Sequence, residues 1–270
     1  MNEADLLLVL GASFSNHTGI YAGHPIIQVD FDQMQLGKFH AVDCPVWGEI
    51  GVVVDQLRAA LGTRTDTRQR EQLAERWAIW RAEKANRARD DRGAGVNSAS
   101  VFAAMQRQIP DDAVIAVDVG NHAYSFGRYF ECRRHTVLMS GYLGSIGFGY
   151  PAAIGAWAAA PERPIVAVTG DGGFAQYMAE LTTAVKHGMN ITHVLLNNGE
   201  LGKISKEQRA GEWQVWQTSL HNPDFAAFAQ LCGAAGYRVS SAGELADSLT
   251  AALAHPGPAL VEVVADPLLV

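Results

Sequence analysis

Residues 165–202 read IVAVTGDGGFAQYMAELTTAVKHGMNITHVLLNNGELG, in which two apolar runs are each followed by a turn of glycines and polar side chains. The apolar runs IVAVT and ITHVLL are typical of strands that are buried on both faces of a parallel sheet. The stretch between them predicts a helix over 174–187. Asp171 follows the first run and Asn198 follows the second. A strand–helix–strand unit places both side chains at the carboxyl edge of one sheet, where α/β proteins bind ligands.

The two turns carry groups from which a phosphate and metal site can be built. The Asp171 carboxylate and the Asn198 amide supply hard oxygen atoms, which Mg²⁺ takes together with phosphate oxygens. The glycines beside Asp171 let backbone amides approach an anion just before the next helix. Either turn alone is most simply a loop. Because both follow adjacent or near-adjacent strands, we expect a diphosphate and Mg²⁺ at this edge.

Strand and helix patterns alternate through the whole C-terminal part of the chain. Repeated units of this kind indicate a parallel sheet with helices on both faces. The expected strands are 113–119, 164–169, 191–196 and 259–264, and the expected helices are one from Asn97 or Ser98 to 108, one starting near 121, and 151–160, 174–187, 225–232 and 245–254. The predicted fold class is therefore α/β with a doubly wound parallel sheet.

The N-terminal part repeats this pattern on a smaller scale. Residues 5–11 and 25–30 read as buried parallel strands, and 48–61 has helical spacing. Two or three strands with one helix are too few for a stable doubly wound layer, because a sheet edge and much of a sheet face would stay exposed. Residues 1–62 are therefore interpreted as half of an α/β domain.

The segment 63–95 differs in composition from both neighbours. Nine of the chain's 21 Lys and Arg residues lie between Arg64 and Arg92, with six acidic residues among them. Mixed charges at this density predict a solvated helical linker and not a nucleic-acid patch. Residues 96–270 are then the second domain.

Composition and charge argue against several classes of protein. The 270-residue chain has a net charge of −7 and a pI near 5.7, which disfavours a nucleic-acid partner. No apolar run reaches the ~18 residues of a membrane span, and no basic-then-apolar leader opens the chain, so we expect a cytoplasmic protein without a membrane partner. Cys44, Cys132 and Cys232 form no CxxC pair and are expected to be buried or free thiols. No strand precedes GxGxxG, which argues against an NAD-type Rossmann protein.

The GDG and NN turns resemble the thiamine diphosphate (ThDP) motif. The stretches DVGNH at 118–122 and GSIGFGYPAAIGA at 144–156 narrow this resemblance to the acetolactate synthase/pyruvate oxidase superfamily. The segment GKISKEQ at 202–208 is most similar to the pyruvate oxidase branch. The resemblance implies a ThDP-binding fold preceded by a partial, Rossmann-like central domain.

The resemblance also implies a role for particular residues. Asp171, Asn198 and the backbone carbonyl of Glu200 would hold Mg²⁺. Ile146 would support the cofactor from beneath, and Glu207 would border the substrate, so both are expected to be catalytic. The complete implied cofactor site consists of Gly120, Asn121, His122, Gly144, Ile146, Gly170, Asp171, Gly172, Gly173, Asn198, Glu200, Leu201 and Gly202.

Simpler readings of three of these residues stay open. His122 is also consistent with a histidine at a helix start, Ile146 with ordinary core packing and Glu207 with a solvated helix acid. Lys203 departs from the apolar or aromatic residue that related enzymes often carry at this place. This departure leaves the identity of the substrate open.

The implied activity is ThDP- and Mg²⁺-dependent decarboxylation of a 2-oxo acid such as pyruvate, with transfer of the acyl fragment in a carboligase or oxidase reaction. No residue here matches the glutamate that activates the pyrimidine ring in the family. We therefore expect this chain to act with a pyrimidine-domain polypeptide or with the remainder of a longer chain, in a homo- or hetero-oligomer. The alternative is a noncatalytic ThDP-binding or structural subunit, or an inactive fragment. FAD is not favoured, although 28–32 matches a stretch near its adenosine in some members.

Overall fold

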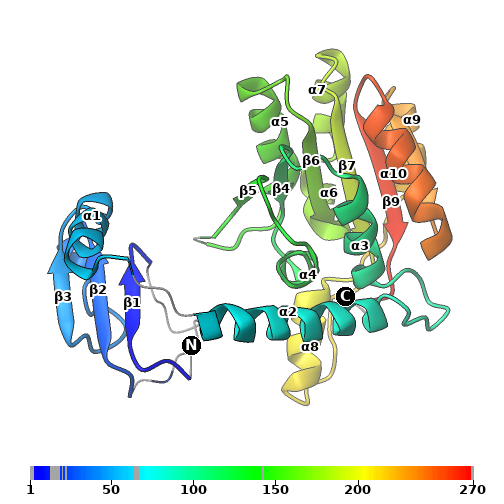
Figure 1. The fold of residues 1–270 in the computed structure, drawn as a ribbon. Helices are drawn as coiled ribbons and strands as arrows, with labels where there is room; N and C mark the ends of the chain where they lie inside the picture. The colour runs from blue at the N-terminus through cyan, green and yellow to red at the C-terminus, as the bar shows by residue number, and fades with distance from the viewer. Residues whose placement is uncertain are drawn as a thin grey trace. The chain divides into compact units, whose positions relative to one another are not determined.

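The computed structural model describes residues 3–12, 19, 21, 23–63, 67–141 and 143–268. The chain separates into two compact units, Met1–Ala74 and Glu75–Val270, and the division falls inside one long helix (Figure 1). The predicted boundaries at 62 and 95 therefore differ from this division. They stay a prediction, because compactness alone does not define a domain.

Within the described part of the second unit, six strands form one sheet in the order β5-β4-β6-β7-β9-β8, and each neighbouring pair is parallel. The strands are β4 (Val114–Val117), β5 (Thr136–Met139), β6 (Ile165–Gly170), β7 (Ile191–Asn197), β8 (Ala235–Val239) and β9 (Ala259–Val264). The four central strands are almost fully buried, as their continuous apolar runs predict.

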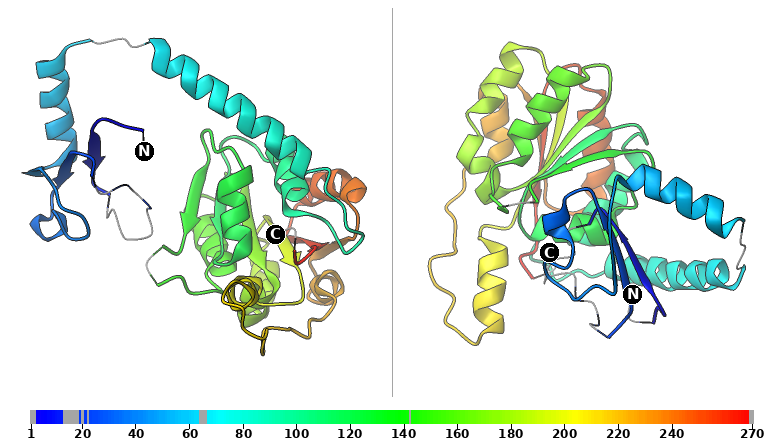
Figure 2. Two further views of the ribbon diagram at one scale, coloured as in Figure 1. Left: turned by 90° about the horizontal axis from the view of Figure 1, so that it is seen from below. Right: turned by 90° about the vertical axis from the view of Figure 1, so that its left-hand side faces the viewer.

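Helices cover both faces of this sheet, which confirms the doubly wound α/β fold (Figure 2). The helices are α3 (Ser98–Gln108), α4 (Asn121–Tyr129), α5 (Gly149–Ala159), α6 (Asp171–Tyr177), α7 (Glu180–Lys186), α8 (Gly202–Ala210), α9 (Phe225–Leu231) and α10 (Leu245–Ala254). One core cluster joins α3, α4 and α10 to the sheet, and the other joins α5, α6, α7 and α9 to the opposite face. Successive strand residues point to opposite clusters, for example Val166 and Ala167 of β6.

The order of the strands creates a switch point between β4 and β6. From β4 the chain passes to β5 on one side, and it then crosses back to β6 on the other side. In such sheets the crevice outside the carboxyl ends of these two strands is the usual ligand site. The turns after β4 and β6 are DVGNH and DGGF, so the topology brings these two motifs together.

Three elements differ from the expectation. The sequence patterns did not predict β5 or β8, which are the two edge strands and are only partly buried. The expected helix over 174–187 is two helices, α6 and α7, and α6 already begins at Asp171. The helix divides because Leu181 and Thr182 donate to carbonyls three residues back, those of Met178 and Ala179.

The first unit contains a smaller parallel sheet of three described strands in the order β1-β2-β3. These are β1 (Leu7–Leu10), β2 (Ile26–Asp30) and β3 (Cys44–Trp47), followed by helix α1 (Ile50–Leu61). Among the described residues of this unit, Leu7, Val9 and Ile26 form a small buried cluster, Val29 is buried as well, and no residue of α1 is buried. The alternate residues of β1 are exposed, as expected for a sheet with one uncovered face.

Most of the charged segment forms helix α2 (Thr67–Arg87), and its C-terminal part belongs to the second unit. Arg81 and Lys84 both pair with Glu131 at 2.8 Å, and the Trp80 indole donates to the carbonyl of Arg128. Ion pairs therefore tie this part of the helix to the residues after α4. Among the described helices, α2 included, none combines the length and apolar character that a membrane span requires.

Candidate functional site

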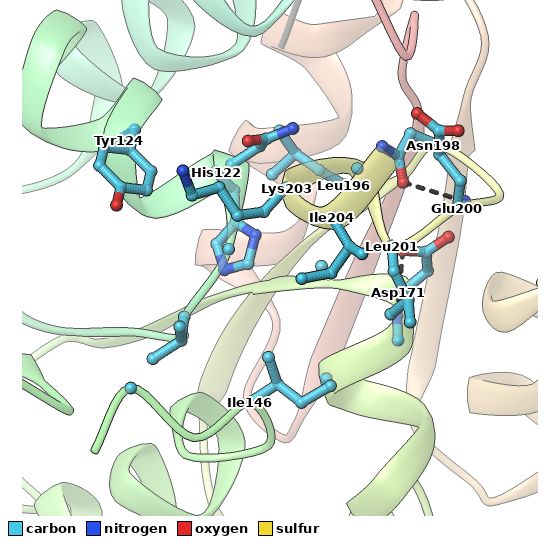
Figure 3. A pocket seen from close by; sticks show the side chains of 18 residues that line it. His122, Tyr124, Ile146, Asp171, Leu196, Asn198, Glu200, Leu201, Lys203 and Ile204 are labelled. Atoms are coloured by element: carbon cyan, nitrogen blue, oxygen red, sulfur yellow. Dashed lines mark hydrogen bonds between the residues drawn. The ribbon is translucent and has the colours of Figure 1, made fainter. Parts of the chain in front are cut away.

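A pocket of about 330 Å³ lies at the carboxyl ends of β4, β6 and β7. Four segments line it, namely 119–124, the loop at 144–146, the turn 170–173 and 196–204. Asp171, Asn198, Glu200 and Leu201 gather on one side of the pocket, whereas His122 and Tyr124 lie on the other (Figure 3). The pocket therefore has a polar end, where the oxygen atoms gather, and a wall that contains apolar side chains.

Asp171 is buried at the polar end, with 3% of its surface exposed. Its Oδ2 accepts from the Gly199 amide at 2.8 Å and from Asn222 Nδ2 at 2.7 Å, and its Oδ1 accepts from the Gly172 amide at 3.0 Å. Burial raises the pKa of this carboxyl group, and the three hydrogen bonds act in the opposite direction. Removal of this side chain would leave the buried Gly199, Gly172 and Asn222 donors without their acceptor.

The Asn198 amide lies beside Asp171 and the backbone of Glu200. The amide atom on this side is 3.3 Å from Asp171 Oδ1 and 2.9 Å from the Glu200 carbonyl oxygen. With oxygen there, three acceptors face one another as around a cation. With the amide turned over, Nδ2 donates to both neighbours instead. The donor set of carboxylate, amide and carbonyl oxygens therefore fits Mg²⁺.

A metal at this place would depend on that mixed donor set. Among the described residues, no group of three or more His, Cys, Asp or Glu side chains could hold a metal ion. One carboxylate with two neutral oxygens gives little charge. Phosphate oxygens would have to supply the remaining ligands, as they commonly do for Mg²⁺.

Glycines allow the chain to pass closely at the turns after β4 and β6. Gly120 has a φ of +143°, and a Cβ atom there would lie 2.9 Å from the His122 ring. A Cβ on Gly172 would lie 2.9 Å from Leu201 Cδ2. The φ at Gly120 favours glycine, and a side chain at Gly172 would require Leu201 to move.

His122 begins the side of the pocket opposite Asp171. Burial lowers the pKa of its ring to about 4, although a hydrogen bond to the backbone of Asp118 opposes this shift. The ring is therefore neutral at pH 7. Within the described chain its Nε2 atom is buried without a hydrogen-bond partner, while the residue lines the pocket. An unpartnered nitrogen at this place is suited to a polar ligand atom.

Asp118 holds the loop that carries Ile146. It is 1% exposed, and it accepts hydrogen bonds from the amides of Val119, Gly147 and Phe148 at 2.7–3.1 Å. A Cβ on Gly173 would lie only 2.2 Å from Asp118 Oδ2, so the two turns fit closely against each other. Ile146 is half-buried in the pocket wall as a result.

The structure brings all the residues of the expected cofactor site together in this one pocket. Glu207 is different, because it does not line the pocket; it lies 58% exposed on α8 and pairs with Lys203 at 2.7 Å. That contact raises the pKa of Lys203, which does line the pocket. The roles of these residues stay predictions.

Asp118 and Asn222 were not predicted as site residues. Asp118 is the first residue of the DVGNH motif. Its position directly after a strand was the signal that could have identified it as a site residue. Asn222 contacts Asp171 from 51 positions away, and nothing in the local pattern marks it. In the stretch 28–32, which was considered for FAD, the Gln28 side chain bonds within its own unit. It donates to the Gln35 carbonyl and accepts from the Gly37 amide.

Comparisons with known proteins agree with this geometry. The family model for the C-terminal TPP binding domain of thiamine pyrophosphate enzymes matches residues 118–263, and the model for their central domain matches residues 1–57. All three cysteines are free, and none lies in the pocket. The first matched range covers the six-stranded sheet apart from β4 and the last residue of β9, and the second contains the described strands of the small sheet.

Curated relatives match over nearly the whole chain. YdaP of Bacillus subtilis (strain 168), provisionally named as a thiamine pyrophosphate-containing protein, is 35% identical over 264 residues, or 97% of this chain and 46% of the relative. The acetolactate synthase isozyme 3 large subunit of Escherichia coli (strain K12) is 29% identical over 94% of this chain and 46% of its own length. The acetolactate synthase large subunit of Corynebacterium glutamicum is 30% identical over 91% and 41%. The chain thus spans about half the length of the curated relatives it matches.

Proposed function

The chain belongs to the thiamine pyrophosphate enzyme family, and we propose that it supplies the diphosphate half of a ThDP- and Mg²⁺-dependent site that decarboxylates a 2-oxo acid. The observation that carries the proposal is the convergence of the Asp171 carboxylate, the Asn198 side-chain amide and the Glu200 carbonyl at one end of a pocket. Glycine turns at the carboxyl ends of two strands border these groups.

In this proposal each end of the pocket has a separate task. Asp171, Asn198 and the carbonyl of Glu200 hold Mg²⁺, which neutralises the charge between the carboxylate and the diphosphate. The amides of Gly172 and Gly173, together with Asn121 and the free Nε2 of His122, hold phosphate oxygens. Gly120, Gly170 and Gly202 leave the space that these contacts need.

The apolar side chains of the pocket orient the reacting part of the cofactor. Ile146 presents an apolar side chain from the loop that Asp118 fixes, and Leu201 and Ile204, from the segment after Asn198, extend the apolar surface. Such a surface excludes water and holds the cofactor in one conformation. ThDP, when bound, supplies the electron sink for loss of CO₂ from a 2-oxo acid. In this proposal the Gly144 carbonyl and the Ile146 amide hold the pyrimidine edge, and both residues line the pocket.

Substrate transfer and partners extend the proposal. Two of the relatives are named acetolactate synthase large subunits, which supports a 2-oxo acid such as pyruvate with a carboligase or oxidase outcome. Because these relatives are about twice as long as the matched segment, we propose that turnover needs a pyrimidine domain beyond the residues aligned here, within an oligomer. Residues 1–62, 63–95 and 96–270 remain the proposed central half-domain, linker and diphosphate domain.

Calorimetric titration with ThDP tests the proposal directly. We expect binding with Mg²⁺ and none with EDTA, because two phosphates beside Asp171 repel it unless a divalent ion intervenes. Equal affinity under both conditions would contradict the metal assignment. Turnover of pyruvate is then measured after adding a pyrimidine-domain polypeptide. Metal-dependent binding without turnover in any such complex would favour the noncatalytic subunit.

A further inference from the structure

A chain of polar side chains runs from Asp171 away from the pocket and into the sheet. Asn222 Nδ2 donates to Asp171 Oδ2 at 2.7 Å and to Asn197 Oδ1 at 2.8 Å. Asn197, at the end of β7, in turn donates from Nδ2 to Glu262 Oε1 at 2.8 Å. Asn222 thus donates to an acceptor at the pocket and to one nearer the core, and Asn197 accepts from Asn222 and donates to Glu262.

The far end of this chain is anchored on rigid elements. Glu262 of β9 is completely buried, and its Oε1 also accepts from Arg238 of β8 at 2.9 Å. Its Oε2 accepts from the amide of Ala226, in the first turn of α9, at 3.0 Å. A cation and a helix start therefore stabilise this buried carboxylate. These contacts fix Glu262 in place. Glu262 in turn positions Asn197, and Asn197 positions Asn222.

The hydrogen bonds to Asp171 determine which of its two oxygens is available to a ligand in the pocket. Oδ2 receives two N–H donors, from Asn222 and Gly199, which occupy both of its lone pairs. Oδ1 receives the Gly172 amide, and it keeps one lone pair for a cation when the Asn198 amide, 3.3 Å away, turns its oxygen to this side. Oδ1 is consequently the better metal ligand.

We propose that Asn222 is a positioning residue, which holds the Asp171 carboxylate in the rotation that points Oδ1 at a divalent cation, with Asn197 and Glu262 as its base. This inference rests on the proposed Mg²⁺ and ThDP site. Residues that orient a metal ligand through a hydrogen bond commonly contribute strongly to metal affinity. These hydrogen bonds connect Asp171, through Asn222 and through Asn197 at the end of β7, to the buried Glu262 of β9.

A neighbour in the same loop provides the matched control. Asp224 lies two residues after Asn222, accepts from the Ala227 amide at 2.8 Å as the cap of α9, and approaches Arg238 at 3.4 Å. These contacts of Asp224 are with α9 and β8, not with Asp171. Asp224→Ala therefore weakens α9 and the loop without removing a bond to the metal ligand.

Mn²⁺ binding to the full chain in the presence of ThDP, followed by electron paramagnetic resonance, tests the inference. We expect Asn222→Ala to weaken Mn²⁺ affinity about 10- to 100-fold, and Asp224→Ala to lower the melting temperature with unchanged Mn²⁺ affinity. Asn222→Ser keeps one hydroxyl donor and should lie between. Wild-type affinity in Asn222→Ala, or equal losses in Asn222→Ala and Asp224→Ala, would overturn the positioning role.

Two further observations separate this inference from the proposed function. If the wild-type chain binds neither Mn²⁺ nor ThDP, the proposed function fails and this inference falls with it. If the wild type binds and Asn222→Ala binds equally well, only the inference fails. Should Asn222→Ala not fold, Asn222→Ser carries the test. A metal-free crystal structure of that variant should show the Asp171 carboxylate rotated, and an unmoved carboxylate would contradict the proposal.

Discussion

The turns after β4 and β6 are built alike but use their carboxylates differently. Each is a glycine-rich turn that follows a buried strand, begins a helix and contains one buried aspartate, Asp118 or Asp171. Burial raises the pKa of both carboxyl groups. Asp118 directs both of its oxygens at backbone amides of its own turn and of the loop with Ile146. Asp171 keeps Oδ1 turned toward other acceptors.

This difference separates a carboxylate that organises structure from one that is available to a ligand. Strand, turn and burial are the same, so these features alone do not identify the functional group. Each carboxylate receives three N–H donors, two on one oxygen and one on the other. What distinguishes the two is their place, because Asp171 lines the pocket beside the Asn198 amide and the Glu200 carbonyl, whereas Asp118 does not line the pocket.

The largest effect should come from removing the carboxylate after β6. Asp171→Ala should abolish Mg²⁺-dependent ThDP binding, a loss greater than the roughly 10- to 100-fold typical of an outer-shell residue. The variant should also be less stable, because Gly199 and Asn222 lose their acceptor. Calorimetry with Mg²⁺ measures the first effect and denaturant unfolding the second. Retained metal-dependent binding would remove the distinction between the two turns.

Removing the carboxylate after β4 should act on stability first. Asp118→Ala leaves at least the amides of Val119, Gly147 and Phe148 without an acceptor, which we expect to cost about 2–4 kcal/mol of unfolding free energy. The freed loop near Ile146 should become sensitive to limited proteolysis. Asp118→Asn keeps the shape and serves as the control for volume. Unchanged stability with lost metal binding would reverse the roles assigned to the two aspartates.

The sequence predicted the central strands and the pocket residues better than the edges and the supporting contacts. Continuous apolar runs identified β4, β6, β7 and β9, because these strands are buried on both faces. β5 and β8 lie at the sheet edges and carry no such run, since only part of each is buried. Tertiary contacts, not local pattern, determine these edges.

The same limit applies to the site. The spacing of the turns predicted that Asp171 and Asn198 lie at one edge of the sheet, and the resemblance to ThDP enzymes supplied the other expected cofactor positions, all of which line the pocket. Neither source reports which distant side chain meets a turn. Asn222 comes to Asp171 only through the folding of the segment before α9, and Glu207 is placed outside the pocket by the direction of α8. Local sequence carries neither fact.

A third comparison of the two turns uses pH. The turn after β4 continues into His122, whose pKa is lowered to about 4 by burial, below its ordinary 6.5. The unfolded chain takes up this proton below pH 6.5, but the folded chain does so only near pH 4. The contribution of the neutral His122 ring to the free energy of unfolding is therefore fully present above pH 6.5, and it is lost as the pH falls through about 4. The effect is at most a few kcal/mol.

Urea unfolding between pH 7 and pH 4 measures this contribution in wild type and His122→Gln. The variant should show a shallower fall in stability over this range. His193, whose pKa burial lowers to about 3, remains in both proteins and accounts for the slope that persists. Identical slopes would show that the pKa of His122 is the same in the folded and the unfolded chain, which would contradict the lowering of this pKa by burial.

The smallest effect should come from a carboxylate that belongs to neither turn. Glu207 is 58% exposed, and its ion pair with Lys203 at 2.7 Å is of the kind that contributes ~0–1 kcal/mol. Glu207→Gln should therefore leave stability and Mg²⁺-dependent ThDP affinity almost unchanged, while Lys203→Met tests the other half of the pair. A catalytic Glu207 would show itself only as lower turnover at unchanged cofactor affinity, measured in the complete complex. If Glu207→Gln weakens ThDP binding as much as Asp118→Ala does, exposure and place relative to the pocket would fail to rank these carboxylates.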